Sequence, residues 1–226
     1  MELNADFNKR VVMHADEIDW LSSPIPGVDR RMLDRIGGEV ARATTIVRYA
    51  PNSKFSPHIH TGGEEFIVLE GVFQDEHGDF PAGSYIRNPP TSGHTPGSDK
   101  GCVIFVKLWQ FDLKDRTPVK IDMNKMGSIR DADRAGVSVM PLFMDERETV
   151  RMETWDANAG IGLDLPDGGE FLVLDGEFTE TGDQLRSHSW LRIPMGGRLD
   201  AKVGHDGAKV WVKSRHLRFA DAPISF

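Results

Sequence analysis

Short runs of apolar and β-branched residues, separated by turn-forming residues, dominate this chain, and long helical periodicity is weak. In the first half these runs are 44–50, 65–73, 84–88 and 103–111. Sequences such as Pro51-Asn52 and Pro96-Gly97 lie between them and are typical of turns. Many short strands with regularly spaced turns predict an all-β fold, a sandwich or a barrel of the jelly-roll type.

The pattern occurs twice along the chain. Residues 62–73 read GGEEFIVLEGVF and residues 167–178 read DGGEFLVLDGEF, which agree at seven of twelve positions at an offset of 105. Further matching segments follow in the same order at nearly constant spacing, which two unrelated β regions are not expected to show. We therefore predict two tandem copies of one β unit, an N-terminal domain over residues 1–120 and a C-terminal domain over residues 121–226.

Composition narrows the class of protein. The chain has 226 residues, 39% hydrophobic and 27% charged, which is typical of a globular protein. A net charge of -8 argues against direct binding of nucleic acid through phosphate neutralisation. No apolar run approaches the roughly 18 residues of a membrane span. A polar, acidic start and a single cysteine, Cys102, indicate the cytoplasm and exclude an internal disulfide.

One group of residues carries the candidate chemistry. His58, His60, Glu64 and Gly71 form the pattern H-x-H-x-x-x-E-x-x-x-x-x-x-G, and His94 follows further along. Residues two apart on a strand point to the same face, and Glu64 begins the strand that returns after a Gly-rich turn. Imidazole and carboxylate donors suit a first-row transition ion such as Zn, Fe, Mn, Ni or Cu better than Ca or Mg. The other five histidines lack such company and are interpreted as structural or surface residues.

The second copy has lost this pattern. At the offset of 105, His58 corresponds to Leu163, His60 to Leu165 and Glu64 to Gly169. The counterpart of His94 is one of Arg198, Leu199 and Asp200. The second copy is therefore predicted to lack the metal ligands and to support the first. A second ligand site is the alternative, and the residues that could line it are Trp190, Arg192, Trp211 and Lys213.

The sequence around the histidine motif resembles the cupin superfamily and, more narrowly, the ChrR-type cupins. The resemblance is carried by residues 57–66 (PHIHTGGEEF), 81–83, 87–90, His94 and 106–109. That resemblance implies small jelly-roll barrels, here duplicated as a bicupin, with a metal ion held by three histidines and one glutamate. The motif assigns these roles to His58, His60, Glu64 and His94. The family includes the C-terminal domain of the anti-sigma factor ChrR and is similar to acetylacetone-cleaving dioxygenases.

Two functions from different classes follow. The first is a metal-dependent oxygenase that acts on a small chelating oxygen substrate, with one divalent transition ion (Zn, Fe, Mn or Ni) as cofactor. Strand positions that could reach its substrate pocket are Tyr85, Arg87, Phe105, Lys107 and Trp109. The alternative is that these residues have only structural roles. Arg87 and Lys107 would then be exposed partners of Glu70 or Asp112, and Phe105 and Trp109 would lie in the core.

The second function is a ChrR-like regulatory sensor in which a zinc ion is structural. A sigma factor as partner follows from the resemblance alone, and a homodimer is compatible with the sequence. In the anti-sigma family the sigma factor is bound by a separate N-terminal helical zinc domain. Only about forty residues precede the first cupin strand here, so that module is not expected in this sequence.

Overall fold

The computed structural model describes residues 1–220 of the chain. The residues form strands joined by turns, and the helical segments among them are the short 3₁₀ turns η1 (Ala15–Glu17), η2 (Met123–Lys125) and η3 (His216–Phe219). The predicted all-β class is therefore confirmed. The last six residues of the predicted C-terminal domain lie outside the described residues. None of the helical segments within 1–220 has the length and apolar character needed to cross a bilayer.

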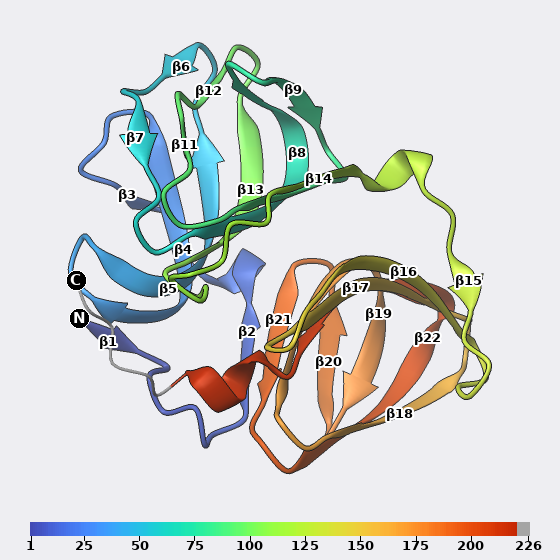
Figure 1. The fold of residues 1–226 in the computed structure, drawn as a ribbon. Coiled ribbons are helices and arrows are strands. Elements are labelled where there is room, and N and C mark those ends of the chain that lie inside the picture. The colour runs from blue at the N-terminus through green and yellow to red at the C-terminus, as the bar shows by residue number, and fades with distance from the viewer. Residues whose placement is uncertain (221–226) are drawn as a thin grey trace. The chain divides into compact units, whose positions relative to one another are not determined.

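Two compact units make up the described chain (Figure 1). The first unit consists of residues 1–5 and 18–125, and the second of residues 6–17 together with the chain from Met126 to Ala220. The chain thus enters the second unit briefly near its N-terminus, returns to build the first unit, and then completes the second.

The first unit is built from one large antiparallel sheet and shorter strand pairs. In the large sheet the strand order along the main path is β1-β4-β5-β13-β8-β10-β14. The strands of this unit are β1 (Glu2–Leu3), β3 (Leu21–Ser22), β4 (Val28–Gly37), β5 (Ala41–Tyr49), β6 (Ser53–Lys54), β7 (His58–Ile59), β8 (Glu64–Asp75), β9 (Gly78–Pro81), β10 (Ser84–Asn88), β11 (Gly93–His94), β12 (Gly97–Ser98), β13 (Cys102–Leu108) and β14 (Val119–Asp122).

The second unit has a corresponding sheet with the order β15-β16-β17-β22-β19-β21-β2. Its strands are β2 (Val11–His14), β15 (Ile129–Arg130), β16 (Val137–Met144), β17 (Thr149–Trp155), β18 (Gly160–Leu165), β19 (Gly169–Glu180), β20 (Asp183–Arg186), β21 (Ser189–Ile193) and β22 (Gly197–Ser214). The strands β8, β9 and β10 recur as β19, β20 and β21 at the offset of 105 seen in the sequence.

Each unit has an edge strand next to the segment of chain that leads into the other unit. β14 pairs with β10 of the first unit, with Val119 opposite Arg87, and β2 pairs with β21 of the second unit, with Val11 opposite Arg192. Both strands are followed at once by a 3₁₀ turn, η2 and η1. Each unit therefore covers one sheet edge with the segment of chain that leads into the other unit, which removes an exposed edge.

Two faces of the first unit's sheet must be distinguished. Phe66 on β8 pairs with Val106 on β13, and both side chains belong to a buried apolar cluster on what we call the inner face. Because successive residues of a strand point to opposite faces, Glu64 shares the inner face with Phe66. Glu65, which pairs with Lys107, points to the opposite side, the outer face.

The glycine that ends the histidine motif has a steric reason. Gly71 lies at φ +70°, just beyond the point where the register of β8 against β13 shifts, and a Cβ there would lie 2.1 Å from the Gly101 carbonyl oxygen. Gly176 on β19 has the same φ and would meet the carbonyl oxygen of Gly207 at 2.1 Å. Only glycine combines a positive φ with so close a backbone approach.

Candidate metal centre

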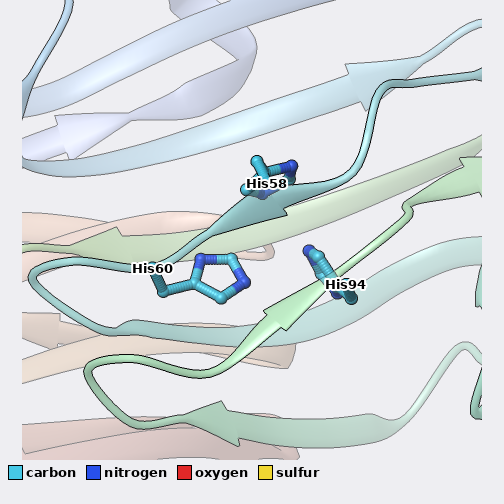
Figure 2. A group of neighbouring side chains, drawn as sticks. All are labelled: His58, His60 and His94. Carbon is cyan, nitrogen blue, oxygen red and sulfur yellow. The ribbon is translucent and has the colours of Figure 1, made fainter.

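Three histidine side chains converge at one end of the first unit. β7 pairs antiparallel with β11, and this pairing puts His94 directly opposite His58. His60 follows β7, and its backbone nitrogen donates to the carbonyl oxygen of Ser92 at 2.8 Å. Figure 2 shows the three rings turned toward a common space, and one ring nitrogen from each lies within 4.8 Å of the others. The three histidines that the sequence motif grouped therefore lie together in the structure.

Glu64 joins the three histidines from β8. Its Oε2 atom lies 3.5 Å from Nε2 of His60 and 3.7 Å from Nε2 of His94. Asn88 on the neighbouring strand β10 donates from Nδ2 to the same oxygen at 3.1 Å. The carboxylate is thus held in place beside two imidazole nitrogens, on the inner face of the sheet. All four residues predicted from the motif lie in one cluster.

A second carboxylate orients His94 from behind. Asp75, the last residue of β8, places Oδ2 3.2 Å from Nδ1 of His94. With Nδ1 engaged by a carboxylate, the lone pair of Nε2 is left for the cluster. The sequence analysis did not single out Asp75 or Asn88. The only signal for Asp75 is its place at the end of the strand that Glu64 begins.

Burial sets the charge of the cluster. Desolvation, with the nearby His58 ring as a second cause, lowers the pKa of His60 to about 4, and burial also lowers the pKa of His94. Both imidazoles are therefore neutral near pH 7, which is the form that binds metal ions. Burial raises the pKa of Glu64, and the neighbouring His94 opposes that rise.

One nitrogen in this cluster lacks a hydrogen bond. Within residues 1–220, Nε2 of His60 has no hydrogen-bond partner, and the side chain that carries it is only 4% exposed. A buried polar atom without a partner is costly unless something outside the chain satisfies it. A metal ion is such a group, so the residues present fit one. His58 is exposed while His60 and His94 are buried, which gives the cluster an open side.

The predicted substrate-pocket residues Tyr85 and Lys107 lie on the outer face, away from the histidines. Tyr85 is fully buried and donates its hydroxyl to Oε1 of Glu65 at 2.6 Å. Lys107 is also fully buried, and its Nζ donates to Oγ1 of Thr44 at 2.9 Å. The structure does not bring these side chains to the inner face.

Arg87 and Phe105 share that outer face, as their pairing positions opposite Glu65 and Ile67 show. Arg87 forms an ion pair with Asp115 and packs over the Phe111 ring at 4.1 Å. The alternative that Arg87 and Lys107 are exposed was wrong, since their exposures are 2% and 0%. Buried cations require polar partners, and the structure supplies Asp115 for Arg87 and Thr44 for Lys107.

Trp109 is the one predicted pocket residue beside the cluster. It follows β13 at φ +59°, and its backbone nitrogen donates to the Gly63 carbonyl oxygen at 3.2 Å. Its indole ring lies against Gly62, where an added Cβ would come within 2.1 Å of the ring. The half-buried Trp109 therefore packs on the turn between His60 and Glu64, and the absence of a side chain at Gly62 makes this packing possible.

The inner face presents a different tyrosine. Tyr49 on β5 pairs with Cys102, whose side chain belongs to the inner cluster. Its ring packs against Phe55 at 4.8 Å and Phe73 at 6.0 Å, and Phe73 in turn lies 5.6 Å from His94. Burial, with the Glu64 charge as a second cause, raises the pKa of Tyr49, so its hydroxyl stays protonated. Cys102 is buried as the sequence analysis expected.

In the second unit, leucines occupy the places of the three histidines. β18 pairs with β22 so that Leu163 lies opposite Leu199, the same relation that His58 has to His94. The register therefore selects Leu199 from the three candidates for this position. Leu165 and Leu199 are buried in the apolar core of the unit, and Leu163 packs against it. Gly169 stands where Glu64 does, so the donor atoms of the first unit have no counterpart here.

The second-site residues considered from sequence do not line the interior of this unit. Trp190 and Trp211 pair with Leu172, whose neighbours Phe171 and Val173 belong to the core, so the two indoles point to the other face. Arg192 and Lys213, which both pair with Glu170, share that face and are buried. The structure thus puts these four side chains on the face opposite the core.

An all-β fold with three histidines and a glutamate in one cluster is what the resemblance to the cupins implies. Residues 8–112 match the family described as the ChrR Cupin-like domain. Over those residues the chain carries a ChrR Cupin-like domain, in agreement with the predicted resemblance to the cupins. The comparison with curated proteins gives no match.

Solved structures of low sequence identity share the fold. A structure titled as a "putative dioxygenase" from Nostoc punctiforme aligns with a TM-score of 0.77 at 14% identity, over 93% of this chain and 84% of that one. A bacterial pirin from Escherichia coli in complex with nickel(II) aligns with a TM-score of 0.65 at 13% identity, over 91% and 98%. An oxalate decarboxylase aligns with a TM-score of 0.62 at 10% identity, over 90% and 76%.

Proposed function

We propose that His58, His60, Glu64 and His94 bind one divalent transition-metal ion, with Zn, Fe, Mn and Ni as the candidates. Three ring nitrogens within 4.8 Å of one another and a carboxylate oxygen beside two of them are a typical donor set for such ions. The neutral imidazoles and the unpartnered Nε2 of His60 support this assignment. Metal-bound relatives are consistent with it, because the similar pirin structure is a nickel(II) complex.

The chain as a whole is best described as a bicupin, with two tandem cupin barrels of which the second lacks the ligands. Support comes from the register, since the pairing of β8 with β10 recurs between β19 and β21 at the sequence offset. The observed units depart from the predicted domains, 1–120 and 121–226, because residues 6–17 with β2 belong to the second unit and the first unit continues to Lys125.

The function that this centre supports best is metal-dependent oxygenase chemistry on a small substrate that chelates through oxygen atoms. The observation that carries the proposal is the open side of the cluster at the exposed His58, which leaves room for a substrate beside the ion. Such an ion would act as a Lewis acid and, if redox-active, as the route to O2. The similar fold of a structure titled as a dioxygenase supports this class.

The chain's own residues would position the reactants. Asp75 holds the ring of His94, and Asn88 holds the carboxylate of Glu64, so the donor geometry is fixed before an ion arrives. On the inner face, the Phe73 ring packs against His94 and shields that side of the cluster from water. The Tyr49 hydroxyl, which burial and the nearby Glu64 charge keep protonated, would offer a hydrogen bond to an oxygen of the substrate.

Metal analysis of protein purified without added metal tests the first step. We expect about one ion per chain in the wild type and none in His60→Ala, while His205→Ala, which changes an 81% exposed histidine, keeps it. Equal loss of metal from both variants contradicts the site. Iron, manganese or nickel together with oxygen uptake in the presence of small β-diketones supports the oxygenase, and absence of uptake with every candidate metal contradicts it.

The matched family favours a second candidate, a regulatory sensor in which the ion is structural zinc. In this case four protein ligands would close the coordination sphere. Zinc at full occupancy, resistant to exchange, and co-purification with a sigma factor would support the sensor. Both candidates use the same four residues, so the identity of the ion separates them.

A further inference from the structure

The second unit contains a cavity at the end where the first unit has its histidines. Its volume is about 140 Å³, and its walls include Arg151, Leu163, Leu165, Ser214 and Arg215. Leu163 and Leu165 stand at the positions of His58 and His60. This end of the unit has thus exchanged imidazoles for apolar walls, while two guanidinium groups have been added.

Arg151 is oriented toward the interior by the sheet. It lies on β17 opposite Val212, which belongs to the core cluster, and its neighbour two residues on, Glu153, points the same way. Nε of Arg151 donates to Oε1 of Glu153 at 2.6 Å, and Nη1 donates to Oγ of Ser214 at 3.3 Å. Within the described chain, Nη2 of Arg151 has no hydrogen-bond partner. The guanidinium is therefore fixed in place with donors to spare.

Arg215 supplies a charge that no side chain balances. It follows β22 at φ +73°, a strained conformation for a residue other than glycine, at the place where the first unit has Trp109. Its guanidinium donates only to the backbone oxygens of Asp145 and Glu146, at 3.1 and 2.9 Å. Among residues 1–220, no carboxylate lies within ion-pair distance of it.

Two acidic residues also line this cavity, and both already have partners. Asp164 forms an ion pair with Arg198, and Asp167 lies 3.6 Å from Arg218. Neither arginine is part of the cavity wall. The charges of the two carboxylates are therefore neutralised by arginines outside the cavity wall. Inside the cavity, the groups left to bind a ligand are the unused hydrogen-bond donors of Arg151 and the hydroxyl of Ser214.

We propose that this cavity of the second unit binds a small carboxylate anion. The carboxylate would accept from Nη2 of Arg151 and from Oγ of Ser214, near the positive charge of Arg215, as charge-assisted hydrogen bonds favour. A short alkyl or keto portion would lie against Leu163 and Leu165. About 140 Å³ equals the volume of four or five water molecules at roughly 30 Å³ each, which limits the ligand to a few carbon atoms.

The experiment measures binding of pyruvate and of propionate by isothermal titration calorimetry. Carboxylates also bind to metal ions, so the titrations use chelator-treated protein on the His60→Ala background, where the first unit holds no ion. The proposal is thereby independent of the metal centre. We expect saturable binding of both acids, and none of propionamide, which has the same shape without the charge.

Two variants remove the guanidinium groups separately. Arg151→Gln should weaken binding about tenfold, the usual effect of losing one charge-assisted hydrogen bond. Arg215→Gly removes the second charge and suits the left-handed backbone, so it should weaken binding without loss of folding. Arg130→Gln, which breaks an exposed ion pair with Asp156, is the matched control and should bind as before. No saturable binding to the parent protein, or unchanged binding in a folded Arg151→Gln variant, overturns the proposal.

Discussion

Oδ2 of Asp75 lies 3.2 Å from Nδ1 of His94, so the two residues form a carboxylate–imidazole pair behind the candidate metal centre. Both side chains are nearly inaccessible, at 5% and 3% exposed. The pair fixes the plane of the ring and leaves Nε2 facing Glu64. In metal centres such an outer partner also raises the basicity of the imidazole that it supports.

The first prediction follows from this pair. Asp75→Asn should weaken metal affinity by about ten- to a hundredfold, because the amide cannot orient the ring as a carboxylate does. Metal affinity is measured by competition with a coloured chelator. The melting temperature of the metal-free protein should change little by comparison, because the donor residues remain.

Asp99→Asn serves as the control, because Asp99 is exposed and its backbone nitrogen, not its carboxylate, makes the hydrogen bond to Gln74. It should bind metal like the wild type. If Asp75→Asn and Asp99→Asn have the same metal affinity, the hydrogen bond between Asp75 and His94 has no role in metal binding.

The spacing of His58, His60 and Glu64 was sufficient to predict the cluster, because strand alternation and one tight turn determine where those side chains point. Neither Asp75 nor the true inner face could be predicted in this way. Whether Arg87 and Lys107 share a face with Glu64 depends on the register between strands: both lie opposite Glu65, and the register of β13 against β8 shifts near Ile104. Alternation within one strand does not determine the register between strands.

The counterpart of His94 illustrates the same point. From the sequence, three adjacent residues were candidates, and each points in a different direction from its neighbour. The pairing of Leu163 with Leu199 decides between them, because it repeats the pairing of His58 with His94. The counterpart of a ligand residue can be predicted from the sequence where the spacing of the two copies is the same. Where loop lengths differ between the copies, the structure is needed to identify it.

The second prediction concerns metal removal. Only the folded state presents the converged ligands, so a bound ion stabilises the protein by mass action, by about 2.7 kcal/mol when the free ion is at a hundred times its dissociation constant. Chelation should therefore lower the melting temperature of the wild type, and re-addition of the ion should restore it. In His60→Ala the same treatments should leave the melting temperature unchanged, as differential scanning calorimetry can show. A shift of equal size in that variant would show that the ion acts elsewhere.

The third prediction tests the glycine of the motif. Gly71→Ala places a Cβ 2.1 Å from the Gly101 carbonyl oxygen at φ +70°, so the backbone of β8 or β13 has to move. We expect a loss of more than about 1 kcal/mol in the free energy of unfolding. Gly38→Ala is the control, because nothing lies within 4 Å of the added Cβ and its φ is not in the left-handed region. Chemical denaturation compares the two variants, and equal stability would show that the close approach does not constrain the strand.

The fourth prediction concerns the buried carboxylate of the second unit. Glu153 accepts hydrogen bonds from Nη2 of Arg134 at 2.8 Å, Nε of Arg151 at 2.6 Å and Nε1 of Trp155 at 2.7 Å, and it is fully buried. Burial alone would raise the pKa of Glu153, but the charges of Arg151 and Arg134 and the indole hydrogen bond outweigh it, so the pKa is lowered. Glu153→Gln should cost about 3 kcal/mol near pH 7, because two half-buried guanidinium groups lose the buried carboxylate that they share.

The pH dependence of that cost has a definite sign. Because the folded pKa of Glu153 lies below the unfolded value of about 4.3, its contribution to stability is complete above that value and is lost as the pH falls through the folded pKa. The difference in unfolding free energy between wild type and Glu153→Gln should therefore shrink in acid, where the wild-type side chain is also neutral. Asp156→Asn breaks only the exposed pair with Arg130 and should change stability by less than about 1 kcal/mol at every pH. A difference for Glu153→Gln that stays constant into acid would show that its charge does not stabilise the fold and that Arg151 is held in place by other contacts.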